Sequence, residues 1–338
     1  MFATTANRQQ AMNTTDVLEN PPTGDHWTRA MREGDFAAAW RVSDAVLAHR
    51  RPQDLNRRDQ PFHLRHVWSG ADLAGRHVLV RCYHGLGDTI QFIRYMPMLS
   101  RVAASITVQA VPPLHDLLGT VAGIDRIVAL DYDRPDPPFE VDIELMELPH
   151  AFRTTLATIP ATVPYLQADD GRLAAARERI GEEQRLKVGI AWSAGEWDRR
   201  RVIPLAGLAP LAAVPGIALF NLQRGPALEE VAAAERHGIR FADDPESWTT
   251  DILDTAATMR TLDLVISVDT MVAHLAGALG VPVWTLLHAA ADWRWMAGRS
   301  DSPWYPTMRL FRQADPGDWG PVVATVAARL GTGLPGDQ

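Results

Sequence analysis

The sequence has little cysteine and no long apolar run, and both absences narrow what the protein can be. Cys82 is the single cysteine among 338 residues, which excludes an internal disulfide framework and any metal site built from several thiolates. A reducing compartment is therefore expected. No run of about 18 apolar residues could span a bilayer, and residues 1–25 are polar where a secretory signal needs an apolar centre. These features predict a cytoplasmic protein without a transmembrane segment.

An excess of positive charge is also missing. The formal net charge is −8, and nucleic-acid binding depends on an electropositive face, so nucleic acid is not an expected partner. Hydrophobic residues make up 46% of the chain and charged residues 22%, which is ordinary for a globular protein and argues against a disordered or fibrous one. A chain of this length favours two domains with an appendage.

Changes of pattern divide the chain into six segments. Residues 1–24 are polar and end in Pro-Pro-Thr-Gly, which predicts a flexible lead-in. Residues 25–67 contain a predicted helical hairpin that turns at Gly34-Asp35 and resembles one tetratricopeptide unit, with no second copy at a period near 34 residues. One such unit cannot bury its own face, so we expect either a structural cap or a contact with another protein.

Strand-like and helical runs alternate in the rest of the chain, which predicts an α/β fold with two facing Rossmann-like domains. Residues 68–168 form the first domain, 169–185 a linker helix, 186–330 the second domain and 331–338 a tail. The expected strands are 77–82, 105–110, 126–130 and 141–145, followed by 186–192, 217–223, 239–243, 264–267, 281–287 and 308–312. Ligands of open parallel sheets collect at the carboxyl ends of the strands, so the chemistry is expected in the cleft between the domains.

The first strand ends in Gly85-Leu86-Gly87-Asp88, just before a helical stretch expected to begin at Thr89. A dinucleotide-binding fingerprint would need a third glycine where Ile90 stands and an acid about 20 residues further on, and neither is present. Asp88 can be a helix N-cap or, facing a cleft, a general base; the residues leave both open.

Polar residues also follow strands of the second domain. Asp269 and Thr270 stand at a predicted helix start, where free N–H groups suit a diphosphate. His274 lies one turn inside that helix. It is either a structural residue or a residue that points back toward the same helix start, and the sequence leaves both open. Arg201 closes a run of three arginines that is either a solvated charge cluster or a phosphate clamp, and Gln223 lies at the same edge.

Other features have simpler interpretations. Trp304 and Tyr305 belong to an aromatic stretch that either closes a pocket or forms a small core, and the core is favoured. His63 and His66 have metal-pair spacing but no third ligand, so no metal site is expected. Phosphate loops of the GxxxxGK[ST] type, GxSxG elbows and HExxH helices are absent from the sequence.

Taken together, the phrases around residues 85–95, 188–193, 201–205, 263–279 and 292–313 resemble the glycosyltransferases related to ADP-heptose:lipopolysaccharide heptosyltransferases, in the branch often fused to tetratricopeptide repeats. The resemblance covers about residues 68–330. It departs from that branch at His84, which stands where a glutamine is common, and at Arg153, which replaces a glycine.

This resemblance implies a GT-B fold and an inverting sugar transfer that needs no metal or other cofactor. Asp88 matches the catalytic base, and Asp269, Thr270 and His274 match the donor-binding helix start. Arg201 stands where a basic residue often lies near the donor phosphates. Gly87, Gln91 and His84 are candidates for the acceptor side of the cleft, and Gln223 for the donor side.

The expected partners are a nucleotide-diphosphate sugar, ADP-heptose-like by resemblance, and a carbohydrate, lipid-linked glycan or protein acceptor. Two other functions stay open. One is a non-catalytic nucleotide-sugar-binding scaffold whose hairpin recruits a partner. The other is a UDP-sugar epimerase of the same architecture, which would need further carboxylates such as Glu196, Glu229 or Glu246.

Overall fold

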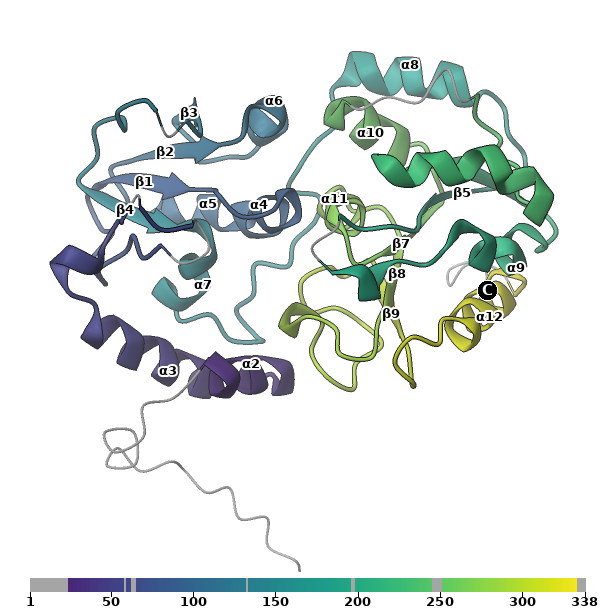
Figure 1. Ribbon diagram of the computed structural model, residues 1–338. Helices are drawn as coiled ribbons and strands as arrows, with labels where there is room; N and C mark the ends of the chain where they lie inside the picture. Colours follow the sequence, from purple (N-terminus) through teal and green to yellow (C-terminus); the bar gives the residue numbers. More distant parts are fainter. Residues whose placement is uncertain are drawn as a thin grey trace, which may run out of the picture.

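The computed structural model describes residues 24–57, 59–61, 65–131, 133–195, 198–244 and 251–332. Two separate sheets of parallel strands lie side by side in the molecule (Figure 1). The first sheet has the order β3-β2-β1-β4 and contains β1 (His77–Arg81), β2 (Ser105–Ala110), β3 (Arg126–Ala129) and β4 (Val141–Glu144). The second has the order β6-β5-β7-β8-β9, with β5 (Leu186–Ala191), β6 (Ile217–Asn221), β7 (Leu264–Val268), β8 (Val283–Leu287) and β9 (Met308–Arg312). The expected α/β fold class with two parallel sheets is confirmed.

The strands form where apolar residues run consecutively. In β1 the side chains of Val78, Leu79 and Val80 are all buried, because helices cover both faces of a parallel sheet. The strand expected at 239–243 was wrong: its described pairing is one isolated bridge between Leu219 and Phe241. The Asp243 carboxylate accepts from the Asn221 backbone N–H at 3.1 Å, so a side chain takes the donor that a longer ladder would use.

Helices and short 3₁₀ turns surround the sheets. The first half of the molecule is built around the first sheet, and the second half is built around the second sheet. The first half contains α4 (Leu86–Phe92), η3 (Ile93–Tyr95), α5 (Met96–Leu99), η4 (Pro112–Leu114), α6 (His115–Leu118), η5 (Leu145–Glu147) and α7 (Leu148–Ala151). The second half contains η6 (Arg199–Arg201), η7 (Leu205–Leu208), α9 (Ala209–Ala212), η8 (Pro226–His237), α10 (Ile252–Met259), α11 (Met271–Ala278), η10 (Trp293–Trp295) and α12 (Gly320–Leu330).

The helix expected as a linker is α8 (Asp170–Ile180), which packs beside α10 of the second half. Arg172 at its start donates to Asp251 at 2.9 Å and to Asp254 at 2.6 Å. These bonds attach α8 to α10 in the second half and leave the connection between the halves to the segment before α8.

The predicted hairpin is confirmed as α2 (Gly24–Glu33) and α3 (Phe36–His49), followed by the turn η1 (Pro52–Asp54). Gly34 turns the chain with a φ of 76°, and the Asp35 side chain caps α3 by accepting from the Ala38 N–H at 2.9 Å. Figure 1 shows α3 below the first half and α2 reaching toward the second. The expected lead-in lies outside the described residues up to position 23, and the expected tail does so from position 333.

The two halves share one continuous hydrophobic core cluster. The buried Arg94 side chain, from η3, crosses the joint: it donates to the Tyr165 hydroxyl at 2.8 Å and to the Trp304 carbonyl, and its guanidinium lies 4.4 Å from the Tyr305 ring centroid. Trp304 and Tyr305 are fully buried, so their predicted core role is confirmed. The sheets are thus joined by a packed interior rather than by a chain connection alone.

Candidate active site at the joint of the two sheets

The candidate residues gather where α4 of the first half packs against α11 of the second. In each sheet the strand order reverses beside the strand that comes first in the chain, β1 or β5, and such switch points are where open α/β sheets bind ligands. The loop after β1 leads into α4, and the loops after β5 and β7 lead to Arg201 and to α11. The sequence therefore brings the polar loop ends of both sheets to one place.

Asp88 lies at the third position of α4, which begins at Leu86 and not at Thr89 as expected. Gly85, with φ −62° and ψ 158°, is the residue that precedes the helix, so Asp88 is not its N-cap. One Asp88 carboxylate oxygen accepts from the Gly85 N–H at 3.0 Å. The other accepts from Nη2 of Arg294, in the second half, at 2.6 Å. The side chain keeps 28% of its surface exposed, so the carboxylate remains within reach of a ligand.

Arg294 lies in η10 and is the residue that sequence reasoning missed. Its guanidinium joins Asp88 to Asp292, to which Nη1 donates at 2.8 Å, and it stacks over the Trp293 ring at 4.6 Å. Burial opposes the charged form, but the carboxylates of Asp292 and Asp88 outweigh it and raise the pKa of Arg294 above its usual range. The sequence signal was an arginine between two tryptophans and two residues after an aspartate.

Asp269 lies at the end of β7 and is buried. Burial raises the pKa of its carboxyl to about 6, above its ordinary value of 3.8. Arg201 donates from Nη1 to the Asp269 backbone carbonyl at 3.1 Å, while its buried Nε has no acceptor among the residues that the structure describes. Thr270 precedes α11 in extended conformation without a side-chain cap bond. Arg201, Asp269 and Thr270 thus form one polar group at the start of α11.

His274 lies one turn into α11 and connects that group to the joint. Its Nδ1 is 3.0 Å from the Tyr305 hydroxyl, its ring stacks on Trp295, and its Nε2 is 4.0 Å from an Asp269 carboxylate oxygen. Burial, followed by the charge of Arg294, lowers the pKa of His274 to about 3, so the imidazole is neutral. Gly87 of α4 touches this ring: a Cβ built there would lie 2.8 Å from Cδ2 of His274.

The remaining three candidates have different surroundings. Gln223 is fully engaged, since its amide oxygen accepts from the backbone N–H groups of Trp192 and Ser193 and its amide nitrogen donates to Arg224. Gln91 is completely buried, and its amide has no hydrogen-bond partner within the described part of the chain. His84 lies 3.4 Å from Glu144 at the end of β4, on the first-half side of the site.

The structure does not describe every residue that the sequence analysis named. His63, Glu196 and Glu246 lie outside the described residues, and Glu229 is exposed on η8. Across the described ranges, no group of three metal-binding side chains is close enough to hold an ion. None of the helices described is both long and apolar enough to cross a membrane.

Comparison with known proteins gives a fold relationship and one partial sequence match. No protein-family model matches the chain. Protein FlbA of Caulobacter vibrioides is 29% identical over an alignment of 288 residues, which covers 78% of this chain and 48% of that protein. The chain thus spans about half the length of this curated relative.

Two solved structures share the architecture. A glycosyl transferase of family 9 from Veillonella parvula aligns with a TM-score of 0.52 and 13% identity, over 76% of this chain and 92% of that one. The ADP-heptose lipopolysaccharide heptosyltransferase II of E. coli aligns with a TM-score of 0.51 and 15% identity, over 75% and 98%. The resemblance to heptosyltransferase-related proteins and the GT-B fold class are confirmed as a likeness of fold.

Proposed function

We propose that this chain is an inverting, metal-independent glycosyltransferase that moves a sugar from a nucleotide-diphosphate sugar to a hydroxyl acceptor. The observation that carries the proposal is the 2.6 Å contact between Asp88 of the first half and Arg294 of the second. It brings a partly exposed carboxylate of α4 into contact with the second half, and α4 itself packs against α11, at whose start the polar group lies. The fold shared with a heptosyltransferase supports the same class of reaction.

The donor diphosphate binds at the second half. Arg201 supplies a guanidinium whose Nε is buried without an acceptor among the described residues, and the first N–H groups of α11 supply further donors. Neutral His274 and Asp269 lie behind them. An ADP-heptose-like donor is the first candidate, because the E. coli relative in fold is an ADP-heptose transferase.

Asp88 serves as the general base. The acceptor oxygen attacks the anomeric carbon as its proton passes to the Asp88 carboxylate, and the bond from that carbon to the diphosphate oxygen breaks with both electrons leaving on the nucleotide diphosphate. Attack opposite the leaving group inverts the anomeric centre. Each carboxylate oxygen can accept more than one hydrogen bond, so the bonds from Gly85 and Arg294 leave room for an acceptor hydroxyl.

The developing charge of the leaving diphosphate is stabilised by fixed donors. Arg201 and the α11 N–H groups act here as a preorganised positive site, which is the role that a divalent cation would otherwise have. The acceptor is a carbohydrate, a lipid-linked glycan or a protein side chain carrying a hydroxyl.

A non-catalytic nucleotide-sugar-binding scaffold is the second candidate. Two observations favour it. Both Asp88 oxygens already accept hydrogen bonds, and the two halves share one hydrophobic core. Such a core opposes the domain motion that many enzymes use in catalysis. Binding of a nucleotide sugar without product over a panel of acceptors would support it.

A thermal-shift screen with ADP, GDP, UDP and their sugars tests the donor site. A specific ligand raises the melting temperature by mass action, and Arg201→Met should abolish that shift while the exposed Arg199→Met keeps it. Equal shifts in the two variants, or no shift with any nucleotide, would contradict the proposed donor site.

A further inference from the structure

The η10 segment, residues 290–297, carries Arg294 and is held at both ends by one residue of the hairpin. Nη2 of Arg32, in α2, donates to the first two carbonyls of the segment, at 3.1 Å and 2.9 Å. The backbone carbonyl of Arg32 accepts from the last N–H of the segment, that of Ala297, at 2.7 Å. Arg32 therefore fixes the chain on both sides of Arg294.

The η10 segment needs such support because part of its backbone is strained. Met296 has a φ of 48°, in the left-handed region that a residue with a β-carbon seldom adopts. Strained conformations of this kind persist only where the surrounding structure fixes them. Arg312 of β9 donates to the carbonyls of Trp295 and Met296 at 3.2 Å and 2.6 Å. Arg312 thus acts from the second half itself, and Arg32 adds the support that comes from the hairpin.

The same hairpin helix also supports the aromatic side chain beside Arg294. The Trp27 ring packs edge-on against Trp293, with the ring centroids 5.1 Å apart. Trp293 stacks on Phe92 of α4 at 6.2 Å, and the Arg294 guanidinium lies 4.6 Å from the first ring and 5.4 Å from the second. A displacement of α2 would therefore reach the guanidinium that bonds to Asp88.

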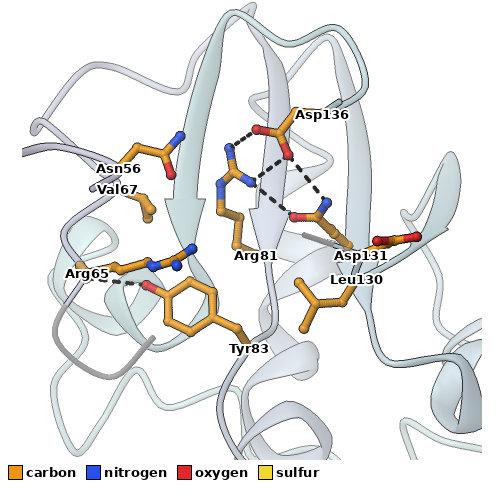
Figure 2. Close-up of a pocket in the computed structure, with 9 residues that line it drawn as sticks. Asn56, Arg65, Val67, Arg81, Tyr83, Leu130, Asp131 and Asp136 are labelled. Atoms are coloured by element: carbon orange, nitrogen blue, oxygen red, sulfur yellow. Dashed lines mark hydrogen bonds and ion pairs between the residues drawn. The ribbon is translucent and has the colours of Figure 1, made fainter. Parts of the chain in front are cut away.

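The hairpin is also fixed to the first half. Arg50, which follows α3, forms an ion pair with Glu147 at 2.7 Å. Figure 2 shows Arg65, from the chain after the hairpin, beside Tyr83, which follows β1; the Tyr83 hydroxyl donates to the Arg65 carbonyl at 3.4 Å. The hairpin therefore connects the half that carries the candidate base to the segment that carries its arginine.

We propose that Arg32 is a positioning residue of the candidate active site: by holding the η10 segment it fixes Arg294 against Asp88, which makes the hairpin part of the transferase. The proposal rests on the proposed function in taking Asp88 as the general base, whereas the fixing of the segment needs no catalysis. Arg32 acts through the segment and not on a substrate, so its loss should lower turnover and leave donor binding unchanged.

Hydrogen exchange followed by mass spectrometry tests the fixing of the segment in the full chain. In Arg32→Met the amides of residues 290–297 should exchange about tenfold faster, because exchange reports local opening. Arg29→Met, at an exposed position of the same helix, should leave their exchange unchanged. Arg32→Lys keeps a charged donor for one carbonyl and should restore part of the protection.

Steady-state kinetics with the donor found by thermal shift tests the effect on the reaction. Arg32→Met should lower kcat by about tenfold or more, because displacing a reacting group by about 1 Å can cost up to about 10²-fold. The KM for the donor should stay nearly the same, and Arg32→Lys should recover part of the kcat. Val326→Ala truncates a buried side chain of α12 in the other hydrophobic cluster, so it lowers stability but should keep kcat.

Three results would overturn the proposal: the η10 segment exchanges equally in Arg32→Met and the unchanged chain, kcat falls equally in Arg32→Met and Val326→Ala, or kcat stays the same or rises in Arg32→Met. A rise would make the hairpin an inhibitory lock. If the unchanged chain yields no product with any donor, the proposed function fails, and the exchange experiment alone decides whether Arg32 fixes the segment that carries Arg294.

Discussion

Arg294 holds a buried positive charge between Asp88 and Asp292, and its side chain is only 9% exposed. Asp88 and Asp292 keep 28% and 38% of their side-chain surface exposed, so the charges left behind when Arg294 is removed stay partly solvated. The loss of stability is then about 1–3 kcal/mol, below the cost for a fully buried pair. Arg294→Met should therefore lower the free energy of unfolding by about that amount, and Arg294→Lys by less. Urea denaturation measures both; a loss below about 1 kcal/mol for the methionine variant would contradict the role of this pair.

The buried Asp269 carboxyl makes the stability of the folded chain depend on pH. The folded chain holds its proton up to about pH 6, while the unfolded chain releases it near the ordinary value of 3.8. The unfolded state thus binds fewer protons in this interval, and the group's contribution to stability falls as the pH rises from about 4 to 6. Asp269→Asn should reduce that fall in melting temperature, whereas Asp170→Asn, at an exposed position, should not. If the melting temperatures of the unchanged chain and both variants fell by the same amount between pH 4 and 7, this assignment would be contradicted.

At the scale of elements, the close approach of α4 and α11 depends on Gly87. A methyl group there would meet Cδ2 of His274 at 2.8 Å, and overpacking of this kind typically costs about 1–3 kcal/mol. Gly87→Ala should lower stability by that amount, while Gly195→Ala, where a Cβ would meet no described atom within 4 Å, should change it little. Chemical denaturation compares the two. Equal stabilities would mean that the helices are not in tight contact.

The hairpin α2–α3 is an element that touches both halves. From α3, Trp40 donates to the Thr154 carbonyl at 2.7 Å, and Asp44 accepts from Arg153 at 2.7 Å in the first half. From α2, Arg32 donates to the Ala291 carbonyl at 2.9 Å and Trp27 packs edge-on against Trp293 in the second half. The hairpin thus packs within its own chain as a cap that contacts both halves.

Trp40→Ala should make this capping role measurable. Truncating a buried tryptophan typically costs about 3–5 kcal/mol, and the side chain is 6% exposed. Calorimetry should show a lower melting temperature for the whole molecule, while Val46→Ala, at an exposed position of α3, leaves it nearly unchanged. Independent melting of the hairpin would show instead that it does not brace the two sheets.

The elements that could be predicted are those whose signal is local. Apolar runs predicted ten strands, of which nine are found in the described residues, and the polar stretches that follow β1 and β7 are where Asp88, Asp269 and Thr270 lie. Arg294 could not be placed, because its contact with Asp88 joins residues 206 positions apart. The failed strand at 239–243 depends equally on a distant partner, the Asn221 backbone. Contacts between residues that are far apart in the sequence are therefore the part of the structure that local sequence patterns do not predict.

For the whole molecule, the shared core has a consequence for unfolding. Because one hydrophobic cluster includes residues of both sheets and Arg94 is buried across the joint, the two halves should unfold in a single cooperative transition. Differential scanning calorimetry measures this. Two resolved transitions would show that the joint is weaker than its packing indicates.

The assay that tests the central claim most directly is release of nucleotide diphosphate from the donor identified by thermal shift, in the presence of a hydroxyl acceptor, by the unchanged chain and by Asp88→Asn. The account predicts that the variant binds the donor with nearly the same affinity but loses turnover by about 10²–10⁴-fold, the usual contribution of a general base. Retained turnover in Asp88→Asn would remove this carboxylate from the reaction and contradict the mechanism.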